Sequence, residues 1–356
     1  MANPIGINGS HNRKETYANQ ILTIARLETN LYDDFSTDYE KDPATGQIMV
    51  PTRDKDVTIT DYDIKNGIEL TVSETDYLPL PIDKNYACNE LIDGYEAQAV
   101  PDNIRAQRIE SAGYSFGKKK EEMAINELMN GTISTDKADL TESDVYKKIV
   151  KEVKNMKKRG MKTSFMRIAL SADTEALLLT DEKFSNSAGN LGAELIREGV
   201  IGKVAGVVTK PNYYLDDEGI DFAVYDKRFC QKYEVWKKEP TIEDLKDGKH
   251  IGASALQGRQ VGGLKVTNPL GVQLKINSKS NILVVSYDVN GGTGSIAPTT
   301  YKGSAITLPD GTGLTGPTGK TVFKGWATAK SKTAPDVTSP YTPSADTTLY
   351  AVWAAE

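Results

Sequence analysis

The chain has 356 residues, of which 38% are hydrophobic and 26% charged, a composition typical of globular chains with two or three domains. Its formal net charge of −6 at pH 7 argues against a general nucleic-acid binder, which needs a basic surface, but leaves room for a local basic face. The two cysteines, Cys88 and Cys230, are too far apart in sequence to suggest a metal site or a disulfide framework. They fit synthesis in a reducing cytoplasm, with one long-range disulfide left open.

The beginning of the sequence lacks the apolar run of a signal peptide. No apolar stretch approaches the ~20 residues that a membrane-spanning helix needs. We therefore expect neither export by that route nor insertion into a membrane.

The first 82 residues are predicted to form two thin extensions. Residues 1–50 are polar, with one short helix expected at 19–31, and such a segment must lie on another surface to be ordered. Residues 51–82 alternate around Asn66-Gly67, the strongest short signal for a β-hairpin, and Pro79 and Pro81 are expected to end its second strand. A two-stranded hairpin is marginal alone, so we expect it to pack against a neighbour, including one in another subunit.

Two helices are predicted next. Residues 86–95 are expected to form a short helix, and residues 101–129 a long one that begins at Pro101 and stops at Gly131. At ~1.5 Å per residue the longer helix would be a rod of about 40 Å. A rod of this length predicts an elongated part of the fold.

A third helix is predicted from Thr141, where Thr141 and Asp144 resemble a capping box. Its apolar stripe consists of Val145, Ile149, Val150, Val153 and Met156. Its remaining surface is rich in lysine, and the candidate residues of a basic binding face are Lys147, Lys148, Lys151, Lys154 and Lys158. Two interpretations stay open: a solvated helix face, or a face turned toward DNA that acts by charge alone, without base readout.

Short strands dominate the rest of the sequence up to residue 276. A strand at 167–170 is followed by a helix at 172–180, which Ser171 caps, and by a short helix within 189–197. Further strands are predicted at 204–208, 220–225 and 229–236, with a turn at 210–212; strands 261–266 and 272–276 are expected to close one sheet. Composition then shifts to Gly, Thr, Ser and Pro, so we place a domain boundary at a polar hinge at residues 277–280.

Catalytic motifs are lacking. His11 and His250 lie in loop-like sequence without metal or triad spacing. The glycines between Gly311 and Gly319 resemble a phosphate loop, but Leu314 replaces a required glycine and Pro317 precludes the helix that must follow. We therefore predict no catalytic, cofactor-binding or metal-binding residue, and no enzyme.

The order of these elements resembles that of tailed-bacteriophage major capsid proteins, a shell fold shared with encapsulins and herpesvirus capsid floors. The stretches that carry the resemblance are the loop at 51–81, the helix at 101–129, RIALSADTEALLL, GVIGKVAGVVTKPN and VGGLKVTNP. The resemblance implies an α+β fold with an N-terminal arm (1–50), an extended hairpin loop (51–82), a peripheral domain with the spine helix (83–144), and an axial α/β domain with returning peripheral strands (145–276).

The same resemblance implies a shell of hexamers and pentamers, located in the virion capsid and assembled in the cytoplasm of a host bacterium. Its expected partners are other copies of the chain, a portal protein and packaged double-stranded DNA, bound non-specifically. Relatives with a scaffold-like N-terminal extension differ from this sequence, which begins almost at the arm, so a separate scaffolding protein is expected.

Residues 281–356 resemble a second family, the Listeria internalin B-repeat module. The stretches that carry this resemblance are VSYDVNGGTGSIAPTTYKGSAITLP, FKGWA and LYAVW. It implies a small all-β, β-grasp-like domain. We expect Trp326 and Trp353 to pack in its core, the alternative being that these aromatic side chains bind a ligand. We expect this domain to be displayed on the outside of the shell, because an inward module would obstruct packaged DNA, and to bind a cell-surface ligand or to decorate the shell.

Two other functions are weighed against a phage capsid. An encapsulin-like nanocompartment shell has the same fold without a genome, and the nucleic-acid content of the particles separates the two. A bacterial surface adhesin is suggested by the C-terminal module alone, but the sequence lacks a signal peptide and a wall-sorting tail.

Overall fold

A computed structural model describes residues 31–36, 46–52, 59–62, 64–65, 67, 76–92, 103–181, 202–246, 249 and 252–355. The helices expected at 19–31 and 189–197, the residue Asn66 of the hairpin turn, and both histidines lie outside the described residues, except Leu31. Cys88 and Cys230 are free thiols, so the long-range disulfide is not formed.

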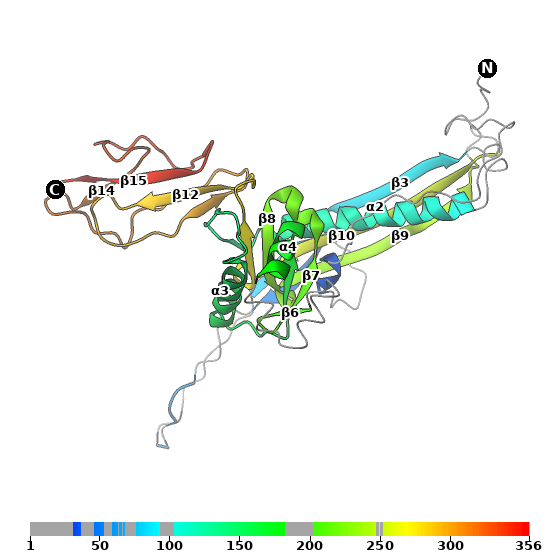
Figure 1. The fold of residues 1–356 in the computed structure, drawn as a ribbon, viewed down its shortest axis with the longest axis horizontal. Helices are drawn as coiled ribbons and strands as arrows, with labels where there is room; N and C mark the ends of the chain where they lie inside the picture. Colours follow the sequence, from blue (N-terminus) through cyan, green and yellow to red (C-terminus); the bar gives the residue numbers. More distant parts are fainter. Residues whose placement is uncertain are drawn as a thin grey trace.

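The elongated part of the molecule is a long helix on a three-stranded antiparallel sheet (Figure 1). Its elements are β3 (Lys84–Ile92), α2 (Asn103–Leu128), β9 (Cys230–Asp244) and β10 (Ser254–Val266), with β10 in the middle of the sheet. Ala112 and Phe116, one helical turn apart, are buried, and the Phe116 ring meets Trp236 edge-on at 4.9 Å. This confirms the predicted spine helix.

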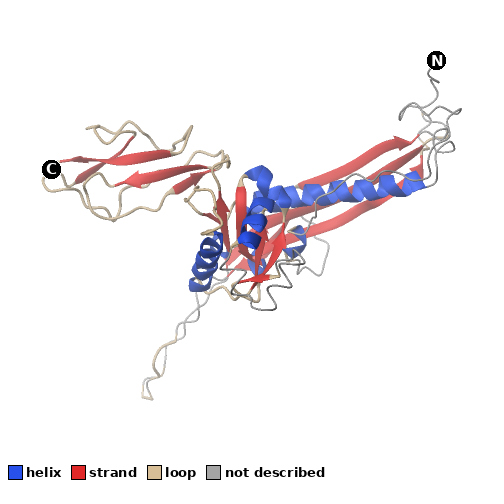
Figure 2. Ribbon diagram, in the orientation of Figure 1, coloured by secondary structure: helices blue, strands red, loops and turns tan. Residues whose placement is uncertain are grey.

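A mixed six-stranded sheet forms the compact part (Figure 2), with helices packed against both of its faces. Its strand order is β4 (Thr132–Ile133), β11 (Val272–Ile276), β8 (Ile220–Asp226), β5 (Met166–Leu170), β7 (Val207–Pro211) and β6 (Lys203–Val204). Along β8, Phe222 and Val224 face a core shared with α3 (Val145–Lys158) and α4 (Ala172–Thr180). Ala223 and Tyr225 face the opposite core, which holds the end of α2. The alternation makes the sheet the central layer of the compact part.

A segment of the N-terminal arm fills part of this second core. Residues 31–36 include the turn η1 (Tyr32–Asp34), and Leu31, Tyr32 and Phe35 are 0%, 4% and 2% exposed. The carboxylate of Glu121, on α2, accepts the backbone N–H groups of Leu31 and Tyr32 at 3.2 and 3.1 Å. The arm is therefore anchored in its own chain at this point.

The C-terminal residues form a separate four-stranded sheet that extends away from the compact part (Figure 1). Its strand order is β13 (Thr299–Tyr301), β12 (Leu283–Asp288), β15 (Thr347–Ala354) and β14 (Val322–Ala327). Trp326 and Trp353 pack in its core, where their indole N–H groups donate to the Pro309 and Val289 carbonyls. The two tryptophans are core residues, as predicted.

The short 3₁₀ turns connect strands at capped positions. They are η2 (Tyr213–Glu218), η3 (Lys227–Phe229) and η4 (Pro269–Gly271). Each begins at a residue whose side chain accepts a backbone N–H: Asn212, Asp226 and Asn268. Ser171 caps α4 in the same way, by accepting the N–H of Thr174, as predicted.

The extended hairpin is present at its base, where β1 (Gln47–Thr52) pairs with β2 (Asp76–Pro81). The second strand ends at Pro81, as predicted, but Pro79 lies inside β2 and does not end it. A two-stranded ribbon has an outer edge without hydrogen-bond partners, and prolines two residues apart can both place their missing N–H groups there. The neighbouring Ile82 N–H donates inward, to the Gly46 carbonyl at 2.8 Å.

Three further predictions are corrected. The helix expected at 86–95 is strand β3 up to Ile92, because tertiary pairing along β10 outweighs a weak local helical pattern. The strand expected at 204–208 is a tight hairpin, in which Ala205 and Gly206, both with positive φ, join β6 to β7, and β7 continues through Pro211. Strands 261–266 and 272–276 lie in different sheets, because β10 pairs with β3 and β9 and β11 with β4 and β8.

Candidate functional site

The lysine-rich helix α3 is held to the compact part by its apolar face. Val145, Ile149, Val153 and Met156 are at most 1% exposed and pack under the six-stranded sheet. The predicted capping box is a short turn ahead of the helix, in which the Asp144 carboxylate accepts the backbone N–H and the hydroxyl of Thr141 at 2.8 and 2.9 Å. Burial of this face directs the opposite face of α3 to solvent.

Four of the five predicted lysines form one exposed stripe: Lys147, Lys151, Lys154 and Lys158. Their spacings of four, three and four residues place them on one side of the helix, over about 16 Å at ~1.5 Å per residue. None of the four makes an ion pair with any residue that the structure describes. Like charges at such spacing repel one another by about 0.2–0.5 kcal/mol per pair, and a bound polyanion would relieve that repulsion.

Lys148 does not belong to this stripe. Its ammonium lies 3.2 Å from the Asp144 carboxylate and 3.5 Å from that of Asp136. Although burial lowers the pKa of Lys148, these two carboxylates outweigh it and raise the pKa above its ordinary value. The i,i+4 spacing of Asp144 and Lys148 is the signal in the sequence that could have separated this lysine from the other four.

The second exposed feature is apolar and lies on the hairpin. Met49 and Tyr77, on β1 and β2, are 47% and 60% exposed, and Ile59, Tyr62 and Ile64, beyond them toward the tip, are 92%, 70% and 88% exposed. Side chains of this kind are normally buried. Their exposure along one thin projection marks a surface that needs a partner.

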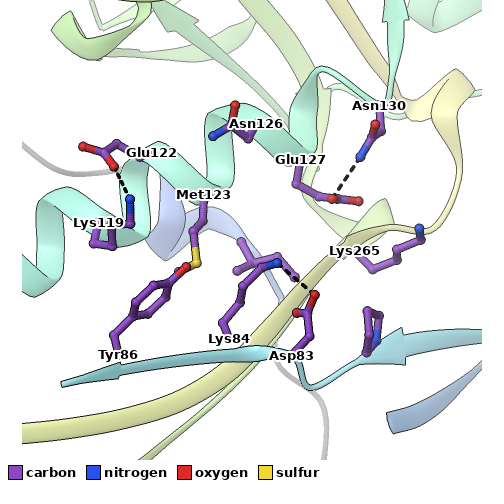
Figure 3. A pocket seen from close by; sticks show the side chains of 12 residues that line it. Asp83, Lys84, Tyr86, Lys119, Glu122, Met123, Asn126, Glu127, Asn130 and Lys265 are labelled. Atoms are coloured by element: carbon purple, nitrogen blue, oxygen red, sulfur yellow. Dashed lines mark hydrogen bonds and ion pairs between the residues drawn. The ribbon is translucent and has the colours of Figure 1, made fainter. Parts of the chain in front are cut away.

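A cavity of about 410 Å³ lies between the start of β3, the C-terminal half of α2 and β10 (Figure 3). Four of its charged side chains form two ion pairs: Lys84 with Asp83 at 2.9 Å and Lys119 with Glu122 at 2.8 Å. Glu127 accepts the Val266 backbone N–H, and burial raises its pKa. Of these contacts, the one between Glu127 and Val266 joins α2 to the sheet, and none of them aligns a nucleophile with a base.

We searched the described residues for metal-ligand clusters, membrane-spanning helices and a phosphate loop. Among them, no three His, Cys, Asp or Glu side chains are arranged to hold a metal ion. None of their helices is long and apolar enough to cross a membrane. The glycine-rich stretch around Gly311, Gly313 and Gly319 consists of turns with positive φ, and no helix follows it within the described residues.

Comparison with known proteins identifies the fold. Residues 284–352 match the family of the Listeria–Bacteroides repeat domain. No curated protein matches the sequence. Three solved chains share the fold of the larger part: one from Mycobacterium phage Che8 (18% identity, TM-score 0.59, 76% of this chain and 98% of that chain), one from the capsid of cyanophage P-SCSP1u (12%, 0.59, 77% and 100%), and one from the mature capsid of bacteriophage PhiM1 (15%, 0.57, 74% and 92%).

These matches cover the phage chains almost completely but leave about a quarter of this chain without a counterpart. The predicted fold class is therefore confirmed: an α+β phage capsid fold with an arm, an extended hairpin, a spine helix and an α/β part, to which a small β domain is appended.

Proposed function

We propose that this chain, which has the fold of tailed-phage capsid proteins, is the major capsid protein of a tailed bacteriophage. In this proposal, hexamers and pentamers of the chain build an icosahedral shell around double-stranded DNA. The observation that carries it is the completeness of the fold match, which covers 98% and 100% of two phage chains. Assembly would take place in the host cytoplasm with a separate scaffolding protein and a portal protein, and the role is structural, not enzymatic.

The exposed hairpin supports the assembly proposal. Ile59 and Ile64 are 92% and 88% exposed in the single chain, although apolar side chains of this size gain about 1.5–3 kcal/mol each from full burial. A neighbouring subunit would provide that burial. The stability of the hairpin is then a property of the shell and not of the single chain.

The open lysines of α3 supply a candidate DNA-facing surface. We propose that Lys147, Lys151, Lys154 and Lys158 contact phosphates of the packaged duplex without reading its sequence. Their stripe is a local exception on a chain whose net charge is −6. Lys148, which is paired within the chain, is left out of this surface.

We further propose the division into an arm (1–50), a hairpin (51–82), a peripheral domain (83–144), an axial domain with returning strands (145–276) and a displayed module (281–356). The position of the module on a separate sheet at one end of the molecule supports display outside the shell (Figure 1). Its proposed role is adhesion to a cell-surface ligand or decoration of the shell. Antibody or protease access tests display: a module that is reachable only after the particles are disrupted contradicts it.

The experiment for the main proposal is electron microscopy of purified particles together with a nuclease-protection assay on the same sample. Closed icosahedral shells with protected double-stranded DNA are the expected result. Closed shells from native cells without DNA would favour an encapsulin-like nanocompartment instead. A chain that stays monomeric under every assembly condition would overturn both shell functions.

A further inference from the structure

The C-terminal module is tied to the larger part of the molecule through one lysine. Lys137 lies in the loop at residues 134–140, between β4 and α3. Its ammonium donates to the Asp346 carboxylate at 2.9 Å, to the Ile282 carbonyl at 3.0 Å and to the Ser280 carbonyl at 3.4 Å. The other oxygen of Asp346 accepts the Val284 backbone N–H at 2.8 Å. The lysine thus joins the linker, the start of β12 and the loop before β15.

The linker is itself fixed at both of its ends, although its composition predicts a polar hinge. Ser278 donates its N–H and its hydroxyl to the Asp139 carboxylate at 3.0 and 3.1 Å. Asn277 donates its N–H to the Gly219 carbonyl at 3.0 Å and its amide to Asp221 at 3.0 Å. Ser280 is only 5% exposed. A hinge that moves freely would leave these groups to solvent.

Close packing at Gly219 is a second, independent sign of a fixed junction. Gly219 adopts a φ of +65°, which disfavours any residue with a side chain. A Cβ atom at this position would lie 2.5 Å from the Ser280 backbone nitrogen. The linker therefore sits directly on the turn between η2 and β8.

The apolar side chains on either side of β12's first residue belong to the core of the larger part. Ile282 and Val284 are each 6% exposed and lie in the same core cluster as Leu274 and the end of α2. Swinging the module away would expose both side chains to water, at about 1.5–3 kcal/mol each. The half-exposed ion pair between Lys137 and Asp346 adds little energy alone, but it selects one orientation.

We propose that Lys137 is a positioning residue that holds the C-terminal module in one orientation on the capsid-type part of the chain. The loop at residues 134–140 therefore contacts the C-terminal module of its own chain. If the proposed shell function holds, every copy presents its module at the same angle, so that a ligand meets a regular array. Only this last consequence rests on the proposed function.

The test measures a distance distribution in the full-length, unassembled chain. Spin labels are placed at Lys154→Cys on α3 and Lys324→Cys on β14, both exposed positions, with Cys88→Ser and with Cys230 left in place because it is fully buried. Pulsed electron paramagnetic resonance should give one narrow distance peak. The Lys137→Met variant, which keeps the aliphatic stem, should broaden that peak, although the linker contacts and the buried Ile282 and Val284 remain.

Two further variants keep the test interpretable. Lys119→Met removes a lysine from an exposed ion pair with Glu122, far from the junction in sequence, and should leave the narrow peak unchanged. Asp346→Asn should broaden the peak less than Lys137→Met, because the two carbonyl acceptors of Lys137 stay in place. Circular dichroism confirms that each variant is folded.

A broad distribution in the parent chain, or a narrow one in folded Lys137→Met, overturns the proposal. Neither result depends on assembly, because the chain is measured before shells form. The proposed capsid function is tested separately, by the microscopy of particles, so the two can fail independently.

Discussion

Two thin segments of the chain, the arm anchor at residues 31–36 and the extended hairpin, have opposite fates. Both are too small to bury a core of their own. The arm anchor places Leu31 and Phe35 at 0% and 2% exposure inside its own subunit, whereas Ile59 and Ile64 of the hairpin are 92% and 88% exposed. Apolar content alone therefore does not decide whether a segment packs on its own subunit or projects from it.

The arm anchor finds polar partners within its own subunit. The Asp34 carboxylate of the arm anchor accepts hydrogen bonds from the Lys210 ammonium at 2.8 Å and from the Tyr225 hydroxyl at 2.7 Å. Tyr32 donates its hydroxyl to Glu234 at 2.8 Å, and the Lys232 ammonium lies 4.3 Å from the centre of its ring. The side chains around the arm anchor thus provide hydrogen-bond partners for polar groups that burial would otherwise leave unpaired.

The largest expected effect comes from shortening a buried side chain of the arm anchor. Phe35→Ala should lower the free energy of unfolding by about 3–5 kcal/mol, because it leaves a cavity in the main core. Urea denaturation of the unassembled chain measures it. The matched hairpin variant, Ile64→Ala, should cost less than about 0.5 kcal/mol. Equal losses of stability in the two variants would contradict the contrast between the segments.

The next effect is a pH dependence at Glu121, which holds the arm anchor. Burial raises the pKa of Glu121 to about 7 from an ordinary 4.5, against the hydrogen bonds from Tyr32, Asn212 and Leu31. A raised pKa means that the stabilising contribution is complete below about pH 4.5 and is lost as the pH rises through 7. At ~1.4 kcal/mol per pKa unit, the loss is at most about 3.5 kcal/mol.

Glu121→Gln, which carries no titrating group, isolates this contribution. Between pH 5 and pH 8 the parent chain should lose stability relative to the variant, as measured by urea denaturation at each pH. The comparison cancels the titration of the other groups near the arm anchor, including Glu234. Parallel pH profiles for the two proteins would rule out Glu121 as the titrating group.

The hairpin should show a smaller change in stability but a large change in assembly. Replacing Ile59 and Ile64 together by Ser should alter the free energy of unfolding of the single chain by less than about 0.5 kcal/mol, because both side chains are already in water. The same variant should fail to form closed shells, which electron microscopy and sedimentation detect. Shell formation at the parent's yield would show that the hairpin's apolar side chains are not buried by a neighbour.

The smallest effect on stability is expected at the α3 stripe. Replacing Lys147, Lys151 and Lys154 by Gln should leave the stability unchanged or raise it slightly, because like-charge repulsion is removed. The log–log slope of duplex DNA binding against salt concentration should become shallower by about 0.9 for each phosphate that the variant no longer neutralises. Lys148→Gln is the control, since this lysine is paired with Asp136 and Asp144 and should not change the slope. An unchanged slope in the triple variant would favour a merely solvated helix face.

Elements with strong local signals could be predicted from the amino-acid sequence alone. A long helix is predicted at residues 101–129, with Pro101 in its first turn and Gly131 as its stop signal. The spine helix is observed at Asn103–Leu128. The cap at Ser171, four of the five residues of the buried stripe of α3 and the core tryptophans of the module were also predicted correctly, because each depends on residues close together in sequence. The order of these elements was enough to identify the fold.

Features that depend on contacts between residues far apart in the chain became visible in the folded structure. Residues 86–92 form a strand because β10 pairs with them. The arm anchor is held in place by the carboxylate of Glu121, about 90 residues away, which accepts hydrogen bonds from its backbone N–H groups. The linker at 277–280 reads as a hinge by composition, yet Asp139 and Gly219 fix it. In each case the deciding energy comes from groups far apart in the chain, whose meeting local sequence patterns do not encode.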